Sequence, residues 1–107
     1  MIVLINGGFG VGKTTTALLL RDRIAPSLLY DPEEIGFAVR AILRDVAPVD
    51  DFQDYPEWRA LTIDAARQLR AHRDHALIVP TTVLRRDYFT EIADGLRAVD
   101  PDLRLLG

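Results

Sequence analysis

The sequence predicts an α/β fold built around a parallel β-sheet, and two features of the chain support this class. Short apolar runs alternate with longer segments whose apolar residues recur at helical spacing. The apolar runs are nearly continuous, which is typical of strands that helices cover on both faces of a parallel sheet. The resulting order βαβααβαβ favours parallel strands joined by right-handed crossovers.

The first half of the chain is expected to contain two strands and two helices. Residues 2–5 form a buried strand, and residues 13–25 form a helix that a proline ends. A short strand follows at residues 27–30. The second helix begins at residues 31–34, where Asp-Pro-Glu-Glu offers a cap, a first-turn proline and a capping-box glutamate, and it ends near residues 47–48. Its expected buried face consists of Ile35, Ala38, Val39, Ile42 and Val46.

The second half is expected to continue with a helix, a strand, a helix and a strand. After a polar loop, a helix begins at Pro56, and residues 76–79 form a third buried strand that Pro80 closes. The last helix covers residues 85–99, and a fourth strand begins at residues 103–106. The apolar stripe of the helix after Pro56 is expected at Trp58, Leu61, Ala65 and Leu69.

Composition narrows the classes of protein to which the chain can belong. With 107 residues, of which 49% are hydrophobic and 27% charged, we expect one globular domain. The net charge of −3 argues against general electrostatic binding to nucleic acid or anionic lipid. The absence of cysteine excludes disulfides, thiolate metal sites and cysteine nucleophiles. Because the apolar run at residues 1–5 is too short for a signal peptide or a membrane span, a cytoplasmic protein is expected.

A glycine-rich turn follows the first strand and carries the most specific motif in the chain. Residues 7–14 read Gly-Gly-Phe-Gly-Val-Gly-Lys-Thr and match the Walker A pattern G-x-x-x-x-G-K-[ST] in full. Such glycines let consecutive backbone N–H groups surround phosphate oxygens at the positive end of the next helix. The residues expected to bind a nucleotide are Gly7, Gly8, Phe9, Gly10, Val11, Gly12, Lys13, Thr14 and Thr15.

The motif predicts individual roles for three of these side chains in binding ATP and Mg²⁺. Lys13 would bridge the β- and γ-phosphates, the Thr14 hydroxyl would ligate the metal, and Thr15 would contact the α-phosphate. The alternative is a glycine-rich turn with no ligand. Lys13 is the only lysine of the chain, and it stands at the one position where this chemistry needs it. We therefore expect a three-layer P-loop NTPase fold with strand order 2-3-1-4 and ligands at the carboxyl ends of the strands.

Four segments extend the match beyond the phosphate loop. The chain resembles the ATP-binding tunicamycin-resistance proteins, a branch of the kinase-like P-loop NTPases, in residues 5–14, 30–40, 51–59, 78–82 and 88–92. The resemblance covers nearly all of the chain, and it implies ATP binding, a kinase-like fold and a nucleoside-like antibiotic as ligand. It also implies a protein of close to twice this length, so the chain is expected to be an N-terminal part without the lid arginines and the adenine-contacting loop.

Asp31 follows the second predicted strand and has two compatible interpretations. In related small-molecule kinases an acid at this place faces the acceptor, so Asp31 could orient or deprotonate a substrate hydroxyl. The simpler interpretation is that it caps the following helix. One carboxylate oxygen could do each.

Three further side chains are candidates for contacting the acceptor. Phe37 and Arg40 lie three residues apart, off the apolar stripe of their helix, and could stack on or hydrogen-bond a sugar or nucleoside. Alternatively, Phe37 packs under the loop at residues 49–55 and Arg40 is solvated. Trp58, with Phe52 and Tyr55, could wall an acceptor pocket or form a hydrophobic staple around Pro56.

Metal ligands other than Thr14 are weakly indicated. His72 and His75 sit at a predicted helix end, where favourable charge at a helix C-terminus explains them more simply than a metal does. P-loop enzymes often place a Mg²⁺-orienting acid at a strand end, yet residues 79–82 read Val-Pro-Thr-Thr. Thr81 or Thr82 could hold a metal-bound water, or Asp31 could replace the missing acid.

Three functions remain compatible with the sequence. The first is phosphoryl transfer from Mg-ATP to a small hydroxylated acceptor, with Lys13 and Asp31 as the catalytic side chains. The second is an ATP-dependent protein that sequesters a drug without modifying it, which the missing strand-end acid favours. The third is an inactive fragment with an exposed sheet edge. The sequence does not predict the oligomeric state.

Overall fold

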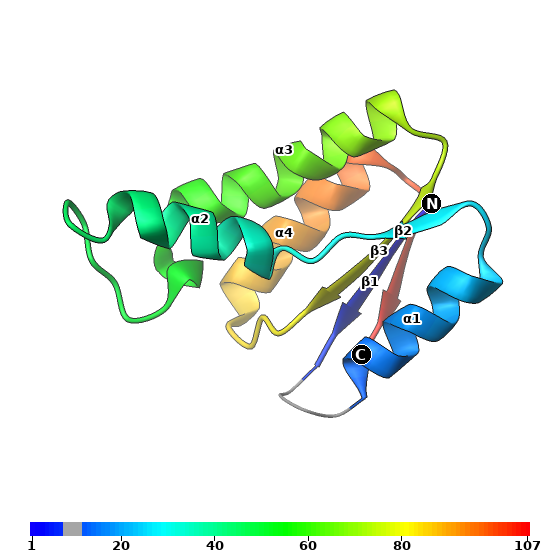
Figure 1. Ribbon diagram of the computed structural model, residues 1–107, viewed down its shortest axis with the longest axis horizontal. Coiled ribbons are helices and arrows are strands. Elements are labelled where there is room, and N and C mark those ends of the chain that lie inside the picture. The colour runs from blue at the N-terminus through cyan, green and yellow to red at the C-terminus, as the bar shows by residue number, and fades with distance from the viewer. Residues whose placement is uncertain (8–11) are drawn as a thin grey trace.

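The computed structural model describes residues 1–7 and 12–107, which form a parallel sheet flanked by helices (Figure 1). In chain order the elements are β1 (Ile2–Asn6), α1 (Lys13–Arg23), β2 (Ser27–Leu29), α2 (Glu33–Leu43), the 3₁₀ turn η1 (Phe52–Asp54), α3 (Pro56–His72), β3 (Ala76–Thr81), α4 (Arg86–Val99) and β4 (Leu103–Leu106). This is the order that the hydrophobic pattern predicts.

The sheet has the strand order β2-β3-β1-β4, and every neighbouring pair is parallel. The predicted α/β class and strand order are therefore confirmed. β1 and β3 are the two central strands, and most of their residues are buried. Their nearly continuous apolar sequences follow from that position, because helices cover both faces of the sheet.

Alternate residues of the central strands point to two separate parts of the core. On one face, Val3, Ile5 and Ile78 pack with Ala17 of α1. On the other face, the larger cluster joins Leu4 and other strand residues to side chains of α2, α3 and α4. Figure 1 shows α1 on one side of the sheet and the other three helices on the opposite side. Because the strands are parallel, the carboxyl ends of β1, β2 and β3 lie at the same edge of the sheet.

β3 continues two residues beyond its predicted end at Val79. It runs through Pro80 to Thr81, with Pro80 opposite Ile5 of β1. Proline is tolerated here because backbone groups along a strand point alternately to its two neighbours. Ile78 O accepts a bond from Tyr30 N on the β2 side, and the amide position of Pro80 points to that same side, where β2 has already ended at Leu29. No ladder hydrogen bond is lost.

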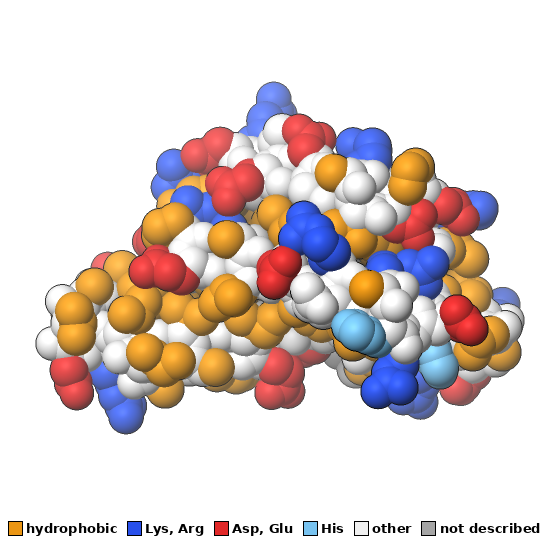
Figure 2. All heavy atoms as spheres, turned by 90° about the horizontal axis from the view of Figure 1, so that it is seen from above, with side chains coloured by type: hydrophobic (Ala, Val, Ile, Leu, Met, Phe, Trp, Pro, Cys, Tyr) orange, Lys and Arg blue, Asp and Glu red, His pale blue; other side chains and the backbone are white. Residues whose placement is uncertain are grey.

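The predicted buried face of α2 is only partly correct. The helix ends at Leu43 rather than near residue 47, and it buries Gly36 and Val39. Ile42 and Val46 are 74% and 80% exposed. Ile42 lies beside the stripe that packs on the core, which runs through Ile35, Val39 and Leu43, and Val46 follows the end of the helix. Figure 2 shows apolar side chains gathered on the left part of the surface, where α2 lies.

The apolar stripe of α3 is rotated slightly from its predicted position. Trp58, Thr62 and Ala66 are the fully buried residues, whereas Leu61 is 46% exposed. Ala65 and Leu69 pack against the edge of the core as predicted. In this rotation α3 packs against α4, and Thr62 rather than Leu61 faces the core.

Within residues 1–7 and 12–107, no helix is long and apolar enough to cross a bilayer.

Candidate functional site

The carboxyl ends of β1, β2 and β3 enclose a cavity of about 190 Å³, called the small cavity here. Its walls come from the start of α1, the β2–α2 turn and the end of β3. The lining residues are Lys13, Thr14, Asp31, Glu33, Pro80, Thr81 and Thr82. Three segments that are far apart in the sequence thus meet where parallel sheets of this type bind ligands.

Lys13 reaches into this region from the first residue of α1. Its ammonium group donates one hydrogen bond to Gly7 O at 3.1 Å and another to Thr82 Oγ1. Both acceptors are uncharged, and within residues 1–7 and 12–107 Lys13 forms no ion pair. The ammonium group therefore remains a partly buried cation at the positive end of a helix, which is a suitable environment for an anion.

The structure describes five of the nine residues that the motif assigns to the nucleotide, namely Gly7, Gly12, Lys13, Thr14 and Thr15. Gly8, Phe9, Gly10 and Val11 lie outside the described residues.

Gly12 has a φ of 70°, in the left-handed region that favours glycine, and its carbonyl accepts the first hydrogen bond of α1 from Thr16 N at 2.8 Å. Thr14 and Thr15 are both exposed at the start of the helix. The described part of the loop therefore leaves α1 with accessible N-terminal side chains.

A side-chain network of Asn6 joins the end of β1 to the segment after β3. Its Oδ1 accepts hydrogen bonds from Val83 N at 2.8 Å and from Thr81 Oγ1 at 3.0 Å, while its Nδ2 donates to Val83 O at 2.9 Å. Thr81 Oγ1 also donates to Ile5 O at 3.0 Å. Thr81 is thus used in fixing the two strand ends, and Thr82 is the threonine that faces Lys13.

Asp31 has the predicted capping role, and it also borders the small cavity. Its Oδ1 accepts a hydrogen bond of 2.9 Å from Glu33 N, so the carboxylate caps the start of α2. The residue also lines the small cavity together with Lys13 and Thr14. One carboxylate oxygen is engaged in the cap, and Asp31 still borders the space in which a ligand would lie.

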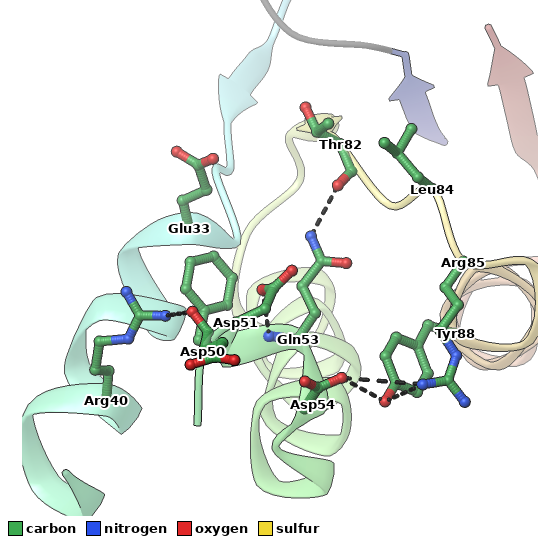
Figure 3. A pocket seen from close by; sticks show the side chains of 11 residues that line it. Glu33, Arg40, Asp50, Asp51, Gln53, Asp54, Thr82, Leu84, Arg85 and Tyr88 are labelled. Atoms are coloured by element: carbon green, nitrogen blue, oxygen red, sulfur yellow. Dashed lines mark hydrogen bonds and ion pairs between the residues drawn. The ribbon is translucent and has the colours of Figure 1, made fainter. Parts of the chain in front are cut away.

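A second cavity, of about 700 Å³, adjoins the small one and is called the large cavity (Figure 3). It lies between α2, the loop that contains η1, and the start of α4. Its lining residues are Glu33, Arg40, Asp50, Asp51, Phe52, Gln53, Asp54, Thr82, Leu84, Arg85 and Tyr88. Glu33 and Thr82 lie at the end nearest the strands, as Figure 3 shows.

Hydrogen bonds hold the walls of the large cavity together. Gln53 Nε2 donates to Thr82 O at 2.8 Å and so fastens η1 to the segment after β3. On the α4 side, Tyr88 donates to Asp54 Oδ1 at 2.7 Å, and Arg85 donates to the Tyr88 hydroxyl at 2.9 Å. The hydrogen bond to Asp54 raises the pKa of Tyr88 above its usual value, because the phenol proton is held between two oxygens.

The charges that line the large cavity are mostly negative. Its lining includes the carboxylates of Glu33, Asp50, Asp51 and Asp54, and two guanidinium groups, those of Arg40 and Arg85. Arg85 is paired with Asp87 at 2.8 Å, and this contact raises the pKa of Arg85 and lowers that of Asp87. Arg40 donates to the backbone carbonyl of Asp50 at 3.0 Å. A ligand in the large cavity therefore meets more carboxylates, which accept hydrogen bonds, than guanidinium groups, which donate them.

The three candidate acceptor-binding side chains of the sequence have different positions. Arg40 lines the large cavity and lies over the Phe52 ring at 5.5 Å. Phe37 is 55% exposed and contacts the edge of Phe52, outside the cavity lining. Trp58 is 1% exposed and donates its indole N–H to Pro32 O at 2.9 Å. Contact of Trp58 with an acceptor is therefore not supported, since the core covers the indole.

The histidines do not form a metal site in the part of the chain that the structure describes. No group of three or more His, Asp or Glu side chains with metal-binding geometry occurs there. α3 ends at His72, and His75 precedes β3. The side-chain oxygens that line the small cavity include those of Thr14, Asp31 and Glu33.

Sequence reasoning did not identify three residues that shape the site. All three fall in segments that carry the family resemblance, and the sequence otherwise places Glu33 in a helix start and Gln53 in a polar loop. The position of Glu33 two residues after Asp31, on the same helix start, is the one signal that could have indicated a second site carboxylate.

No protein-family model and no curated protein sequence matches the chain. Among solved structures, a tunicamycin resistance protein from Deinococcus radiodurans is similar over 97% of this chain, with a TM-score of 0.83 and 33% sequence identity. A gluconokinase from Sinorhizobium meliloti 1021 is similar over 97% of this chain, with a TM-score of 0.56 and 19% identity. The chain spans 59% of the first protein and 54% of the second. The resemblance inferred from the sequence is thus confirmed, and the gluconokinase supports the kinase-like fold.

Proposed function

Because the chain shares the fold of a P-loop kinase and a third of its aligned residues with a tunicamycin resistance protein, we propose that it binds ATP and acts as a kinase-like resistance protein. The observation that carries this proposal is the position of Lys13. Its ammonium group lies at the start of α1, beside a cavity at the carboxyl edge of the sheet, with only neutral oxygens as partners within the described residues.

The small cavity is the proposed site of the terminal phosphates. A phosphate oxygen can replace Gly7 O and Thr82 Oγ1 as the partner of Lys13, and a charge-assisted hydrogen bond is stronger than the neutral ones that it replaces. The positive end of α1 adds to the attraction. The Thr15 side chain, exposed on the same turn, is proposed to contact the α-phosphate, and the loop at residues 7–12 to surround the phosphate chain.

Mg²⁺ fits the donor set beside this position. Thr14 and Asp31 provide a hydroxyl and a carboxylate at the same cavity, and hard oxygen ligands are the type that Mg²⁺ prefers. The ion, when bound, would neutralise charge on the β- and γ-phosphates. Thr14 would hold it directly, and Asp31 would be near it in place of the acid that is missing after β3.

The large cavity is proposed to bind the acceptor. It adjoins the small cavity, so a hydroxyl placed there can approach the γ-phosphate in line with the leaving oxygen. Its carboxylate-rich lining favours an uncharged ligand with many hydroxyl or amide donors, and disfavours a phosphorylated one. A nucleoside-like antibiotic of the tunicamycin type has that chemistry, and Arg40 and Phe52 offer polar and aromatic contacts to it.

The first experiment measures nucleotide binding by calorimetry with Mg-ATP. The Lys13→Ala variant should bind ATP about 10- to 100-fold more weakly, because a charge-assisted contact to phosphate is lost. Its stability should change by no more than about 1 kcal/mol, since only two hydrogen bonds to neutral groups are removed. Arg23→Ala is the matched control, because it removes one positive charge from the opposite end of α1. Equal affinities of the wild-type and Lys13→Ala proteins would contradict the proposal.

A second candidate function is sequestration of the drug without chemical change. It is favoured by the sequence after β3, where residues 79–82 contain no carboxylate to orient a metal. Mass analysis of tunicamycin after incubation with the protein and Mg-ATP separates the two functions. A gain of one phosphate group supports transfer, whereas ATP-dependent binding of unmodified drug supports sequestration.

A further inference from the structure

The small and large cavities are separate pockets that share two lining residues, Glu33 and Thr82. If the γ-phosphate lies in the first cavity and the acceptor in the second, these two residues stand beside the path of the transferred phosphoryl group. Of the two, only Glu33 has a carboxylate, which is a side-chain group that serves as a general base in enzymes. Glu33 therefore borders both proposed ligands, whereas Asp31 lines only the small cavity.

Thr82 is already engaged in fixing other parts of the site. Its hydroxyl accepts a hydrogen bond from Lys13, and its carbonyl oxygen accepts one from Gln53 at 2.8 Å. These contacts join the phosphate-binding lysine to η1, which forms part of the wall of the large cavity. Thr82 is therefore a structural link between the cavities.

Glu33 combines a fixed backbone with an accessible carboxylate. Its N–H donates to Asp31 Oδ1 at 2.9 Å, and the preceding Pro32 is held by the indole of Trp58. The Glu33 carboxylate, in contrast, makes no hydrogen bond or ion pair with any residue in 1–7 and 12–107, and the side chain is exposed. In Figure 3 it projects from the first turn of α2 at the end of the large cavity nearest the strands.

Resting on the proposed function, we propose that Glu33 is the catalytic base that accepts the proton of the acceptor hydroxyl. In this step the acceptor oxygen forms a bond to the γ-phosphorus of ATP, and the bond from that phosphorus to the β,γ-bridging oxygen breaks. The hydroxyl proton moves to the Glu33 carboxylate, and ADP leaves with the electron pair of the broken bond. The proton later passes from Glu33 to solvent, because the side chain is exposed.

Asp31 is less suited to the same task. One of its oxygens already accepts the Glu33 N–H, and the residue does not line the large cavity. Its position beside Thr14 in the small cavity fits the neighbourhood of the phosphates and the cation. The two carboxylates would thus have different roles, Asp31 on the nucleotide side and Glu33 on the acceptor side.

The experiment compares Glu33→Gln with Glu34→Gln. Both substitutions remove one carboxylate from the first turn of α2, and Glu34 lines neither cavity, so Glu34→Gln controls for charge and helix stability. Phosphorylated product is measured by mass analysis with Mg-ATP and tunicamycin, and ATP affinity by calorimetry. Glu33→Gln should reduce the rate of transfer by about 100-fold or more, which is the range for loss of a general base. Glu34→Gln should transfer within about twofold of wild type and bind ATP as wild type does. Glu33→Gln should bind ATP at least as tightly as wild type, because it removes a negative charge from the lining of the small cavity.

The possible outcomes distinguish a failure of the proposed role of Glu33 from a failure of the proposed phosphoryl transfer. If the wild-type protein transfers phosphate and Glu33→Gln does so equally well, the role of Glu33 is refuted and transfer itself stands. Equal losses in the two variants, or a loss of ATP affinity in Glu33→Gln that accounts for its slower rate, refute the role as well. If the wild-type protein binds ATP but forms no product, phosphoryl transfer is refuted, and a base for that reaction is refuted with it.

Discussion

The indole N–H of Trp58 donates a hydrogen bond of 2.9 Å to the carbonyl oxygen of Pro32, and both residues are buried. This contact ties α3 to the first turn of α2, where Asp31 and Glu33 project toward the two cavities. The polar site thus depends on a buried aromatic side chain of the core. The bond also explains why a tryptophan, rather than another apolar residue, stands at the start of α3.

The Trp58→Phe variant should be less stable than wild type by about 2 kcal/mol, because it loses buried surface and the hydrogen bond to Pro32. The Pro32 carbonyl retains its bond from Gly36 N at 3.1 Å, which limits the loss. Urea unfolding measures the change. Leu61→Ala, at a position of α3 that is 46% exposed, is the control and should cost clearly less. Equal losses in the two variants would argue against the importance of the indole contact.

The Asn6→Asp variant should lose about 2 kcal/mol of stability and should bind ATP more weakly. The carboxylate can still accept the bonds from Val83 N and Thr81 Oγ1, but one of its oxygens then faces Val83 O, where the amide donates now. It also places a negative charge beside the proposed phosphate site. Gln68→Glu, at an exposed position of α3, controls for the added charge. Unfolding and calorimetry check the two effects, and wild-type values in both would contradict the network.

The Gly36→Ala variant should be destabilised although alanine favours helices by about 1 kcal/mol over glycine. A Cβ at this position would lie 2.5 Å from two carbons of the Phe52 ring, so α2 and η1 would have to separate. Overpacking of this kind costs about 1–3 kcal/mol. Adding Phe52→Leu makes room for the methyl group, so the double variant should lose less stability than the two single variants together. Additive losses would indicate that the ring does not cause the cost.

The Asp100→Asn variant should be less stable at neutral pH by about 1–2 kcal/mol. Asp100 Oδ2 accepts a hydrogen bond of 2.7 Å from the N-terminal ammonium group and lies 3.2 Å from Arg70 Nε. Burial opposes ionisation of Asp100, but these contacts and a hydrogen bond from Asp102 N outweigh it and hold its pKa below the usual value.

The effect of Asp100→Asn should depend on pH in one direction. Because the pKa of Asp100 is lower in the folded than in the unfolded state, its ionised form stabilises the protein above about pH 4, and this stabilisation is lost as the pH falls through the folded value. Urea unfolding at pH 7, 5 and 3 should show a difference that shrinks with acidity. Asp102→Asn, in an exposed pair with Arg104, is the control and should change stability by less than about 0.5 kcal/mol. A difference that persists unchanged at pH 3 would contradict the assignment.

The fold could be predicted from the sequence where a run or spacing of apolar residues corresponds directly to the residues that are buried. The continuous apolar run at residues 2–5 indicated a central strand, and β1 is one. The same reasoning placed Ile42 on the buried face of α2, where it is 74% exposed. The stripe that packs on the core runs through Val39 and Leu43, so apolar spacing alone did not determine how the helix is rotated about its axis. Pro80 was assigned as a strand end because its tolerance inside β3 depends on where β2 stops, which only the sheet register shows.

The site could be predicted where a residue type has one dominant use. Lys13 was identified because a lysine after a glycine-rich turn has few roles other than phosphate binding, and it lies beside the small cavity. Trp58 was predicted to contact the acceptor, but its indole is buried in the core, where its N–H donates to Pro32 O. Glu33 was overlooked because a glutamate at a helix start has a sufficient local explanation. Glu33 borders both cavities only because the fold brings Thr82, just after the end of β3, beside it, and the sequence does not show this proximity.

The neutral partners of Lys13 bear on the kinetics of ligand capture. Gly7 O and Thr82 Oγ1 can be exchanged for phosphate oxygens one at a time, and neither exchange requires two opposite charges to be separated first. An anion that reaches Lys13 therefore gains a charge-assisted contact without first breaking an ion pair, so binding should not be slowed by the loss of a competing carboxylate partner.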